Sequence, residues 1–370
     1  MNSSINRQLI IIAPTCPPGV CGVSDHAYKT ALALGKYYGS VKIGVEYFPA
    51  LIPDTPLPIT TAYWHQLLDQ LKKSKIPGDI LLNYTPTSYA RSGLPLKLLS
   101  ALKKLKKASA DHHLFVFIHE TWDGSENLKL HHQLRNVFIK QTIKQISQIA
   151  DGITVVTNEQ KQKIEAITFK PKIRLSLVGA NILPFDKAYG LNSTRTPGDW
   201  LIFGLAHTRF WTLQQHLNLI KELQSKGVIK RIYAIGPKDN TFSDQEQALA
   251  NNTFGPGFLI QMGTLVAEEV SKMMLNAEAA LVGQTADSLR KSGTFAALSA
   301  HAVPVICEAP ITLDEPPGYA LIRPDELRGN VELISSTEGE KRRQLLHQWF
   351  WLTRSWEAIA LDMHTWIRAN

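Results

Sequence analysis

The segment Arg290–Phe295 has the composition of an anion-binding site at the start of a helix. It reads Arg-Lys-Ser-Gly-Thr-Phe and precedes an apolar helical pattern. Ser292 or Thr294 can cap that helix, and Gly293 lets the backbone approach a ligand closely. The first amides of a helix have no partner within it, and together with the helix dipole they favour an anion. Lys291 directly before the cap opposes the dipole, which favours a bound phosphate group over a plain capped helix.

A second glycine-containing loop follows the first apolar run of the chain, Leu9–Ala13. It spans residues 17–26 and has Gly19 and Gly22 three positions apart. This spacing does not match the G-x-G-x-x-G dinucleotide fingerprint, but it permits a tight loop whose amides face a ligand. An ordinary turn between a strand and a helix explains the spacing equally well.

His119 and Glu120 follow the apolar run Leu114–Ile118. A histidine at the end of a strand can hydrogen-bond a substrate hydroxyl or transfer a proton. A single histidine is more often structural, so the sequence leaves both roles open for His119.

The motifs of several other reaction classes are missing from the sequence. It contains no P-loop, no G-x-S-x-G and no H-E-x-x-H. It also contains no Asp-x-Asp, the usual carboxylate pair that holds a metal-bound sugar diphosphate. The three cysteines are too few for a disulfide framework and lack zinc-site spacing. We therefore expect no metal and no cofactor.

The elements that would position these residues alternate between short apolar runs and helical patterns. The first half contains six strand-like runs: Leu9–Ala13, Lys42–Phe48, Ile80–Tyr84, Leu114–His119, Ile153–Thr157 and Ile173–Val178. The second half contains six more: Trp200–Leu205, Arg231–Gly236, Phe258–Gly263, Ala279–Gly283, Val303–Cys307 and Tyr319–Ile322. Such alternation predicts parallel sheets with helices on both faces. Ligands of these sheets bind beyond the carboxyl ends of the strands, where the motifs described above lie.

The length of 370 residues, 44% of them hydrophobic, predicts two domains. We expect an α/β fold with doubly wound, Rossmann-like domains at 1–185 and 200–345. A segment rich in proline and glycine at 186–199 would link them. A C-terminal helix at 346–370 would pack back towards the N-terminal domain.

No apolar stretch approaches the about 18 residues of a membrane span, and the N-terminal run is too short for a signal sequence. We therefore expect a cytoplasmic protein. Its charge is uneven: residues 1–185 carry 22 Lys and Arg against 12 Asp and Glu, whereas residues 186–370 carry 18 against 20. The net charges of +10 and −2 indicate that the first half faces an anionic partner.

The helical pattern Leu94–Lys107 concentrates five lysines in this basic half. Its apolar side is formed by leucines at helical spacing, Leu94, Leu98, Leu102 and Leu105. Such a helix either docks peripherally on an anionic membrane, here the inner face, or is an ordinary solvated surface helix. Nucleic acid is not expected, because no aromatic residues are interleaved with the lysines and no recognised binding module is present.

Several segments together, in order and spacing, resemble the GT-B glycosyltransferases, and among them the family-4 group of retaining nucleotide-sugar enzymes. The segments are Gly-Val-Cys-Gly-Val-Ser-Asp at 19–25, Asn-Tyr at 83–84, Phe-Ile-His-Glu at 117–120, Ala-Asp-Gly-Ile-Thr-Val-Val-Thr-Asn at 150–158, Gly-Thr-Leu-Val-Ala-Glu-Glu-Val at 263–270, Lys-Ser-Gly-Thr-Phe at 291–295 and Ala-His-Ala-Val-Pro-Val at 300–305. The similarity spans nearly the whole chain. It implies two domains facing each other across a cleft, and transfer of a hexose from a nucleotide-sugar to a glycan, lipid-linked or small-molecule acceptor, as in polysaccharide biosynthesis. The anomeric configuration would be retained, without a metal.

The resemblance also implies roles for individual residues. The catalytic residues would be His119, Lys291 and Arg209. Positive groups and amides stabilise the diphosphate leaving group, and the residues that would bind the donor are Gly22, Ser292, Gly293, Thr294 and Gly263. Arg209, expected in the loop after the strand Trp200–Leu205, would bind the same diphosphate or be a solvated loop residue. His119 would contact the donor sugar. The acceptor side would be formed by Asp25, Glu120 and Tyr84.

One departure from the family concerns two glutamates separated by seven residues. They would fall at Leu289 and Ala297, and neither position is acidic. In the family the first glutamate normally lies by the donor sugar and the second by the nucleotide ribose. The chain therefore either handles its donor through residues 291–293, as a divergent branch, or is a catalytically silent partner subunit that binds nucleotide or carbohydrate. A nucleotide-sugar 2-epimerase is a further alternative, but its cluster of acidic and histidine catalytic residues has no counterpart that we can place.

Overall fold

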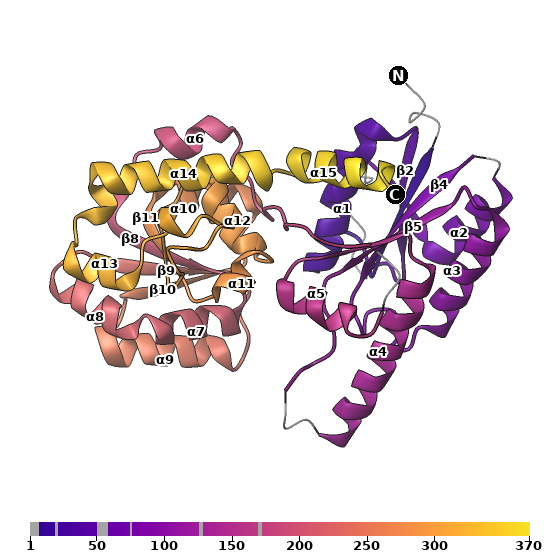
Figure 1. Ribbon diagram of the computed structural model, residues 1–370. Helices are drawn as coiled ribbons and strands as arrows, with labels where there is room; N and C mark the ends of the chain where they lie inside the picture. Colours follow the sequence, from indigo (N-terminus) through magenta and orange to yellow (C-terminus); the bar gives the residue numbers. More distant parts are fainter. Residues whose placement is uncertain (1–6, 19–20, 50–57, 75, 126–128, 169–171) are drawn as a thin grey trace. The chain divides into compact units, whose positions relative to one another are not determined.

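The computed structural model describes residues 7–18, 21–49, 58–74, 76–125, 129–168 and 172–370 (Figure 1). The chain forms two compact units. Unit 1 contains Met1–Leu177 and the C-terminal segment Trp356–Asn370, and unit 2 contains Val178–Ser355.

Unit 1 is built on a parallel sheet of seven strands in the order β3-β2-β1-β4-β5-β6-β7. The strands are β1 Gln8–Ala13, β2 Ser40–Val45, β3 Thr60–Tyr63, β4 Gly78–Tyr84, β5 His113–Ile118, β6 Gly152–Val155 and β7 Lys172–Leu175. The strand order reverses between β1 and β4, so the sheet has the switch point at which doubly wound proteins bind ligands.

Helices cover both faces of this sheet (Figure 1). They are α1 Gly22–Leu34, α2 Trp64–Lys73, α3 Leu96–Ala108, α4 Leu130–Ile149, α5 Asn158–Glu165 and α15 Trp356–Arg368. Helices α2 to α5 form one core with alternate residues of the strands, such as Ile10 and Ile12 of β1. Helices α1 and α15 pack against each other on the opposite face, where Trp366 of α15 contacts Gly152. Strands buried on both faces read as continuous apolar runs, which is why β1, β4 and β5 could be found from the sequence.

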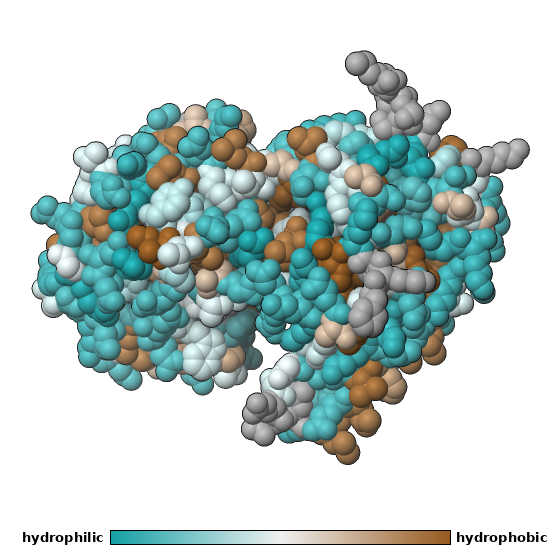
Figure 2. Space-filling model, viewed as in Figure 1, coloured by the Kyte–Doolittle hydropathy of each residue, from teal (hydrophilic) through white to brown (hydrophobic). Residues whose placement is uncertain are grey.

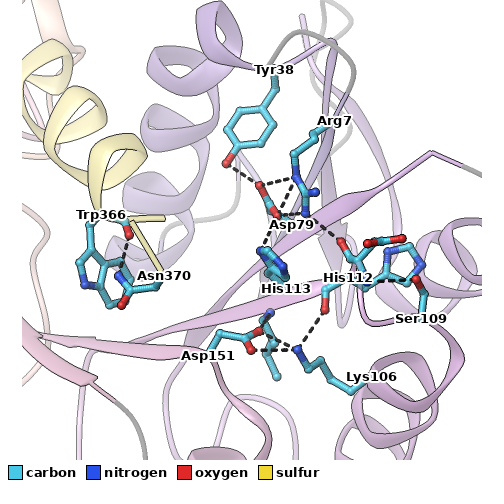
Figure 3. A network of polar contacts seen from close by, with 12 residues as sticks. Arg7, Tyr38, Asp79, Lys106, Ser109, His112, His113, Asp151, Trp366 and Asn370 are labelled. Atoms are coloured by element: carbon cyan, nitrogen blue, oxygen red, sulfur yellow. Dashed lines mark hydrogen bonds and ion pairs between the residues drawn. The ribbon is translucent and has the colours of Figure 1, made fainter. Parts of the chain in front are cut away.

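A polar network secures the amino-terminal edge of the sheet in unit 1 (Figure 3). The carboxylate of Asp79 is fully buried at the start of β4, where it accepts hydrogen bonds from Arg7 Nε at 3.1 Å and Tyr38 Oη at 3.0 Å. Asp151 accepts from Lys106 Nζ at 2.8 Å and from the amide of Leu114 at 2.6 Å. The network therefore fixes α3 to β5 at the amino-terminal edge of the sheet. Ligands of such sheets bind at the opposite, carboxyl-terminal edge.

Unit 2 contains a five-stranded parallel sheet in the order β10-β9-β8-β11-β12. The strands are β8 Thr196–Phe203, β9 Arg231–Ile235, β10 Leu259–Gly263, β11 Ala277–Val282 and β12 Val305–Cys307. The helices are α6 Lys187–Asn192, α7 Ala206–Gln215, α8 Leu217–Ser225, α9 Phe242–Phe254, α10 Ala267–Asn276, α11 Ala286–Leu289, α12 Gly293–Ala300, α13 Pro324–Gly329 and α14 Thr337–Thr353. The predicted α/β class with two doubly wound parallel sheets is confirmed.

Three element boundaries differ from those expected. The segment 186–199 is not an open linker, because it contains α6 and the start of β8. Its Arg195 donates hydrogen bonds to the carbonyls of Met274, Ala277, His301 and Ala302, which fix it to unit 2. The region expected to be a strand at Tyr319–Ile322 forms a 3-10 turn and one isolated bridge between Ile306 and Ile322, whereas the short strand β3 was not expected.

The C-terminal region forms two helices instead of the single helix expected at 346–370. Helix α14 begins after the cap Ser336, whose hydroxyl accepts a hydrogen bond from the amide of Gly339, and ends at Thr353. Arg354 and Ser355 interrupt the helical pattern, and α15 begins at Trp356. The break coincides with the boundary between the two units. None of the described helices is long and apolar enough to cross a membrane.

Candidate functional site

The start of α12 in unit 2 has the local structure that its sequence predicts. Ser292 is the N-cap, and its hydroxyl accepts a hydrogen bond of 3.1 Å from the amide of Phe295. The hydroxyl of Thr294 lies 2.9 Å from that of Ser292. Gly293 and Thr294, the first two residues of the helix, are half-buried. A Cβ at Gly293 would meet only ordinary contacts, the nearest at 3.5 Å, so packing does not require glycine there.

The turn that precedes α12 is held by a buried arginine that the sequence analysis did not identify. Arg354 is 0% exposed, and its guanidinium donates to the carbonyls of Leu289 at 3.1 Å, Arg290 at 3.0 Å and Ser292 at 3.3 Å. It also donates to the carbonyl of Val178 at 2.7 Å. Burial lowers the pKa of Arg354 to about 9, so the side chain is still a cation at neutral pH. This charge lies directly behind the cap of α12 and adds to the positive end of the helix.

The other basic residues near this turn differ in their environment. Lys291 is exposed, while Arg290 forms an ion pair of 2.9 Å with Glu315. Of these two residues, Lys291 is the one whose side chain reaches solvent. The two positions at which the family has glutamates, Leu289 and Ala297, are both 0% exposed and belong to the apolar core of unit 2. A carboxylate there would be buried among apolar side chains.

Arg209 lies in helix α7 and not in a loop as expected, because α7 begins at Ala206. Its guanidinium is fully buried and forms an ion pair with Glu246 at 3.2 Å. It also donates to the carbonyls of Gly204 at 2.8 Å and Pro237 at 3.1 Å. Burial raises the pKa of Glu246, and the neighbouring Arg209 opposes that shift. We therefore assign to Arg209 the positioning of the loops after β8 and β9 and no direct contact with a diphosphate.

Three adjacent strands of unit 2 end at glycines with positive φ. Gly204, Gly236 and Gly263 follow or close β8, β9 and β10 with φ of 150°, 135° and 70°. At Gly236 a Cβ would lie 2.0 Å from the carbonyl oxygen of Gly204, so only glycine fits. Exposed apolar residues, Leu205 and Val266, stand in the loops that leave this edge. The sequence analysis identified Gly263 but not the other two glycines.

Unit 1 carries a buried polar cluster at the carboxyl ends of β4 and β5. The side-chain oxygen of Asn83 lies 2.9 Å from Nε2 of His119 and 3.3 Å from Nδ1 of His26. An amide oxygen only accepts hydrogen bonds, so both ring nitrogens donate to it. Burial lowers the pKa of His26 to about 4 and that of His119 well below its ordinary value. Both imidazoles are therefore neutral at pH 7, and Nδ1 of His119 is left as a hydrogen-bond acceptor.

Packing fixes the orientation of these rings. The ring of His119 stacks on Phe117 with centroids 4.5 Å apart, and its backbone carbonyl accepts from Gln160 at 2.8 Å. His26 on α1 lies 4.6 Å from Phe117 and 5.5 Å from Trp356 at the start of α15. His26 and Asn83 were not among the predicted site residues, although Asn83 stands in a segment that carries the family resemblance and His26 directly follows another.

The remaining predicted residues of unit 1 do not all reach the same surface. Tyr84 is 0% exposed and points into the core beneath α2 to α4, so its predicted acceptor contact is wrong for this structure. Side chains alternate along a strand, and Asn83 therefore points to the other face. Asp25 is half-buried in the first turn of α1, and burial raises its pKa while Lys29 opposes the shift. Glu120 and Gly22 are exposed, whereas Gly19 lies outside the described residues.

Comparisons with known proteins identify the fold. No protein-family model matches the chain, and no curated protein matches its sequence. Among solved structures, Anabaena Alr3699/HepE in complex with UDP aligns over 99% of this chain and 100% of its own, with a TM-score of 0.65 and 8% identity. Sucrose-phosphate synthase from Thermosynechococcus elongatus covers 98% of both chains at a TM-score of 0.62 and 15% identity.

WaaG, a glycosyltransferase involved in lipopolysaccharide biosynthesis, covers 96% of this chain and 98% of its own, with a TM-score of 0.61 and 10% identity. These structures are GT-B glycosyltransferases, and the chain has the fold that they share. The predicted resemblance to GT-B proteins is thereby confirmed at the level of fold.

Proposed function

We propose that the chain is a glycosyltransferase that takes a hexose from a nucleotide-sugar and binds the diphosphate of that donor at the start of α12. The observation that carries the proposal is the arrangement of positive groups there: the first amides of α12, the exposed Lys291 and the buried cation of Arg354 behind the cap. The comparison supports the ligand class, because the HepE structure with the same fold was solved with UDP.

The chemistry of this arrangement suits a departing nucleoside diphosphate. Negative charge develops on the diphosphate as the glycosidic bond breaks, and fixed positive groups stabilise that charge. Lys291 contributes a mobile ammonium, while the amides of Gly293 and Thr294 contribute oriented dipoles. Because Gly293 has no side chain, a phosphate oxygen can approach its amide closely. In this proposal the protein supplies the positive charge that a metal supplies elsewhere.

The glycine-lined edge formed by Gly204, Gly236 and Gly263 is our proposed site for the nucleoside. At Gly204 and Gly263 the nearest atoms to an added Cβ are 3.6 and 3.9 Å away, so a flat ring can approach the backbone there, whereas Gly236 is needed for packing against Gly204. Leu205 and Val266 offer apolar surface to the ring. Arg209 supports this edge from below through the carbonyl of Gly204. Neither of the two family glutamates is needed for these contacts.

In unit 1 we assign His119 to a sugar hydroxyl. Its neutral ring offers Nδ1 as an acceptor, and the bond from Nε2 to Asn83 fixes the tautomer. A ring that remains neutral is a poor proton donor at pH 7, so we assign His119 to binding and not to acid catalysis. Asp25 and Glu120 are then the candidates for the acceptor, a glycan or lipid-linked molecule. In this proposal the anomeric configuration of the transferred sugar is retained, and no side chain acts as a nucleophile.

The test is release of nucleoside diphosphate from a panel of nucleotide-sugars, with binding of the nucleoside diphosphates measured alongside. Lys291→Ala should lower kcat/KM by the equivalent of about 2–4 kcal/mol, the range for removing one electrostatic donor. Gly293→Ala should keep the fold, because Ala fits the helix start, and should weaken diphosphate binding by blocking the amide. Lys221→Ala, an exposed lysine on α8, is the matched control and should behave as wild type.

The alternative is a silent protein that binds nucleotide as a partner subunit. Saturable binding of a nucleoside diphosphate, weakened by Lys291→Ala but without turnover of any donor, would favour this alternative. Binding and turnover that are both unaffected by Lys291→Ala and Gly293→Ala would refute the proposed site.

A further inference from the structure

The outer side of α4 exposes apolar side chains that unit 1 leaves uncovered. Leu130, Leu134, Val137 and Phe138 are 71%, 54%, 60% and 41% exposed. Their spacing of four, seven and eight residues from Leu130 places them along one side of the helix. The opposite side packs into the core of the unit. Figure 2 shows hydrophobic surface along the lower end of α4.

A groove of about 700 Å³ continues this apolar stripe towards the start of α3. It is lined on one side by Leu94 and Leu96 and on the other by Val137 and Phe138. Leu96 is itself 64% exposed. The apolar surface therefore extends over two neighbouring helices.

The charged residues of the two helices that carry this surface all have a positive sign, while the acidic Asp69 and Glu46 lie beside Leu96 and Lys97 at its border. Helix α3 contains five lysines and α4 contains one arginine and two lysines, and neither helix contains an acidic residue. Lys106 pairs with Asp151 and Lys103 donates to Gln145, so these two are engaged within the unit, and Lys140 Nζ lies 5.2 Å from the centroid of the Trp122 ring. The lysines of the two helices that reach solvent are Lys97, Lys104, Lys107, Lys140 and Lys144.

We propose that this surface, formed by the outer side of α4, the start of α3 and the exposed lysines, docks on an anionic lipid bilayer. The apolar stripe would enter the headgroup region while the lysines contact the headgroups. An apolar stripe bordered by lysines is the composition of helices that lie in a membrane interface. Each lysine near an anionic surface strengthens binding about fivefold.

This surface differs from the one that the sequence pattern of residues 94–107 suggests. Leu98, Leu102 and Leu105 are 1–2% exposed and form part of the core, so they are not available to lipid. The apolar contact comes from α4 and Leu96, and α3 contributes charge. The inference does not depend on glycosyl transfer.

The experiment is flotation of the full chain with vesicles of phosphatidylcholine, with or without about 30 mol % phosphatidylglycerol. Wild type should float with the anionic vesicles, poorly with the neutral ones, and less as salt rises because the attraction is screened. The double variant Leu134→Gln and Val137→Gln should weaken binding roughly tenfold. Its control is Leu352→Gln with Leu361→Gln, two exposed leucines on α14 and α15, which should bind as wild type.

The charge contribution is tested in parallel. Replacing Lys104 and Lys144 by Gln should reduce binding roughly 25-fold, whereas the same change at the exposed Lys221 and Lys341 of unit 2 should not. The two test variants and the two control variants should all bind nucleoside diphosphate as wild type does. This measurement separates failure of this inference from failure of the proposed function.

Three outcomes would overturn the inference. Wild type would fail to float with anionic vesicles even at low salt, or the α4 variant would float as well as wild type. In the third, wild type would be a dimer that Leu134→Gln and Val137→Gln make monomeric. The surface would then be an interface between two copies of the chain.

Discussion

The role of Arg354 can be tested by replacing it with lysine. The lysine ammonium keeps the positive charge, but it cannot hold the four carbonyls that the planar guanidinium reaches at 2.7 to 3.3 Å. A lysine of this length would satisfy one or two of these carbonyls and leave the others without their charged donor. Each buried carbonyl left in this way costs about 1–2 kcal/mol, so we expect a loss of about 3–4 kcal/mol in the free energy of unfolding.

The same change should weaken the proposed phosphate site. The carbonyls of Leu289, Arg290 and Ser292 belong to the turn that sets the cap of α12, and loosening that turn disorders the amides beyond it. The assay combines thermal unfolding with calorimetric binding of whichever nucleoside diphosphate binds wild type. We expect Arg354→Lys to lower Tm by roughly 6–15 °C and to weaken binding at least about tenfold, equivalent to 1.4 kcal/mol.

A matched control exists on helix α14, which ends directly before Arg354. Arg343 of α14 also donates to backbone carbonyls, those of Gly190 and Leu191, but these belong to α6 and not to the turn before α12. Arg343→Lys should cost stability and leave diphosphate binding unchanged. If Arg354→Lys binds as tightly as wild type, or if Arg343→Lys weakens binding equally, the reasoning that links Arg354 to the phosphate site is wrong.

Three further predictions follow from the site geometry. The pKa of His26 falls on folding from 6.5 to about 4, so the folded state binds fewer protons than the unfolded chain; stability should therefore be full above pH 6.5 and decrease by about 3 kcal/mol as pH falls to 4. His26→Gln should flatten that decrease in acid unfolding curves, and an unchanged slope would contradict the assignment. Gly236→Ala should disrupt unit 2 because its Cβ would lie 2.0 Å from a carbonyl oxygen, whereas Gly255→Ala, with φ of 94° but open space around it, should cost only about 1 kcal/mol of strain; equal melting temperatures would refute this packing argument. Turnover of a donor should survive EDTA, and abolition by EDTA with rescue by magnesium or manganese would exclude our metal-independent proposal.

The sequence by itself determined the class of fold and the local structure of the phosphate motif. Strands β1, β4 and β5 could be predicted from the sequence alone, because a strand covered on both faces needs an unbroken apolar run. The cap at Ser292 could be read for a similar reason: its hydroxyl bonds an amide only three residues away. Local rules suffice where both partners of an interaction lie within one turn of the chain.

Only the tertiary structure decided the roles of the buried polar residues. Arg209 pairs with Glu246, which is 37 residues away. This ion pair keeps its guanidinium away from the diphosphate contact expected of a loop residue. Arg354 reaches carbonyls that are 62 to 176 residues away. His26 and His119 meet at Asn83, which is 57 residues from the first and 36 from the second. Spacing along the chain carries no information about such partners.

The two helices of the proposed membrane surface show the same limit for apolar residues. Leu98, Leu102 and Leu105 of α3 recur at helical spacing, as do the apolar residues of α4, yet these leucines are buried and the outer residues of α4 are not. A periodic pattern shows that a helix has an apolar side, but the neighbouring elements decide whether that side is covered. Helix α4 has apolar residues on two sides, and the sheet and its flanking helices can cover only one of them.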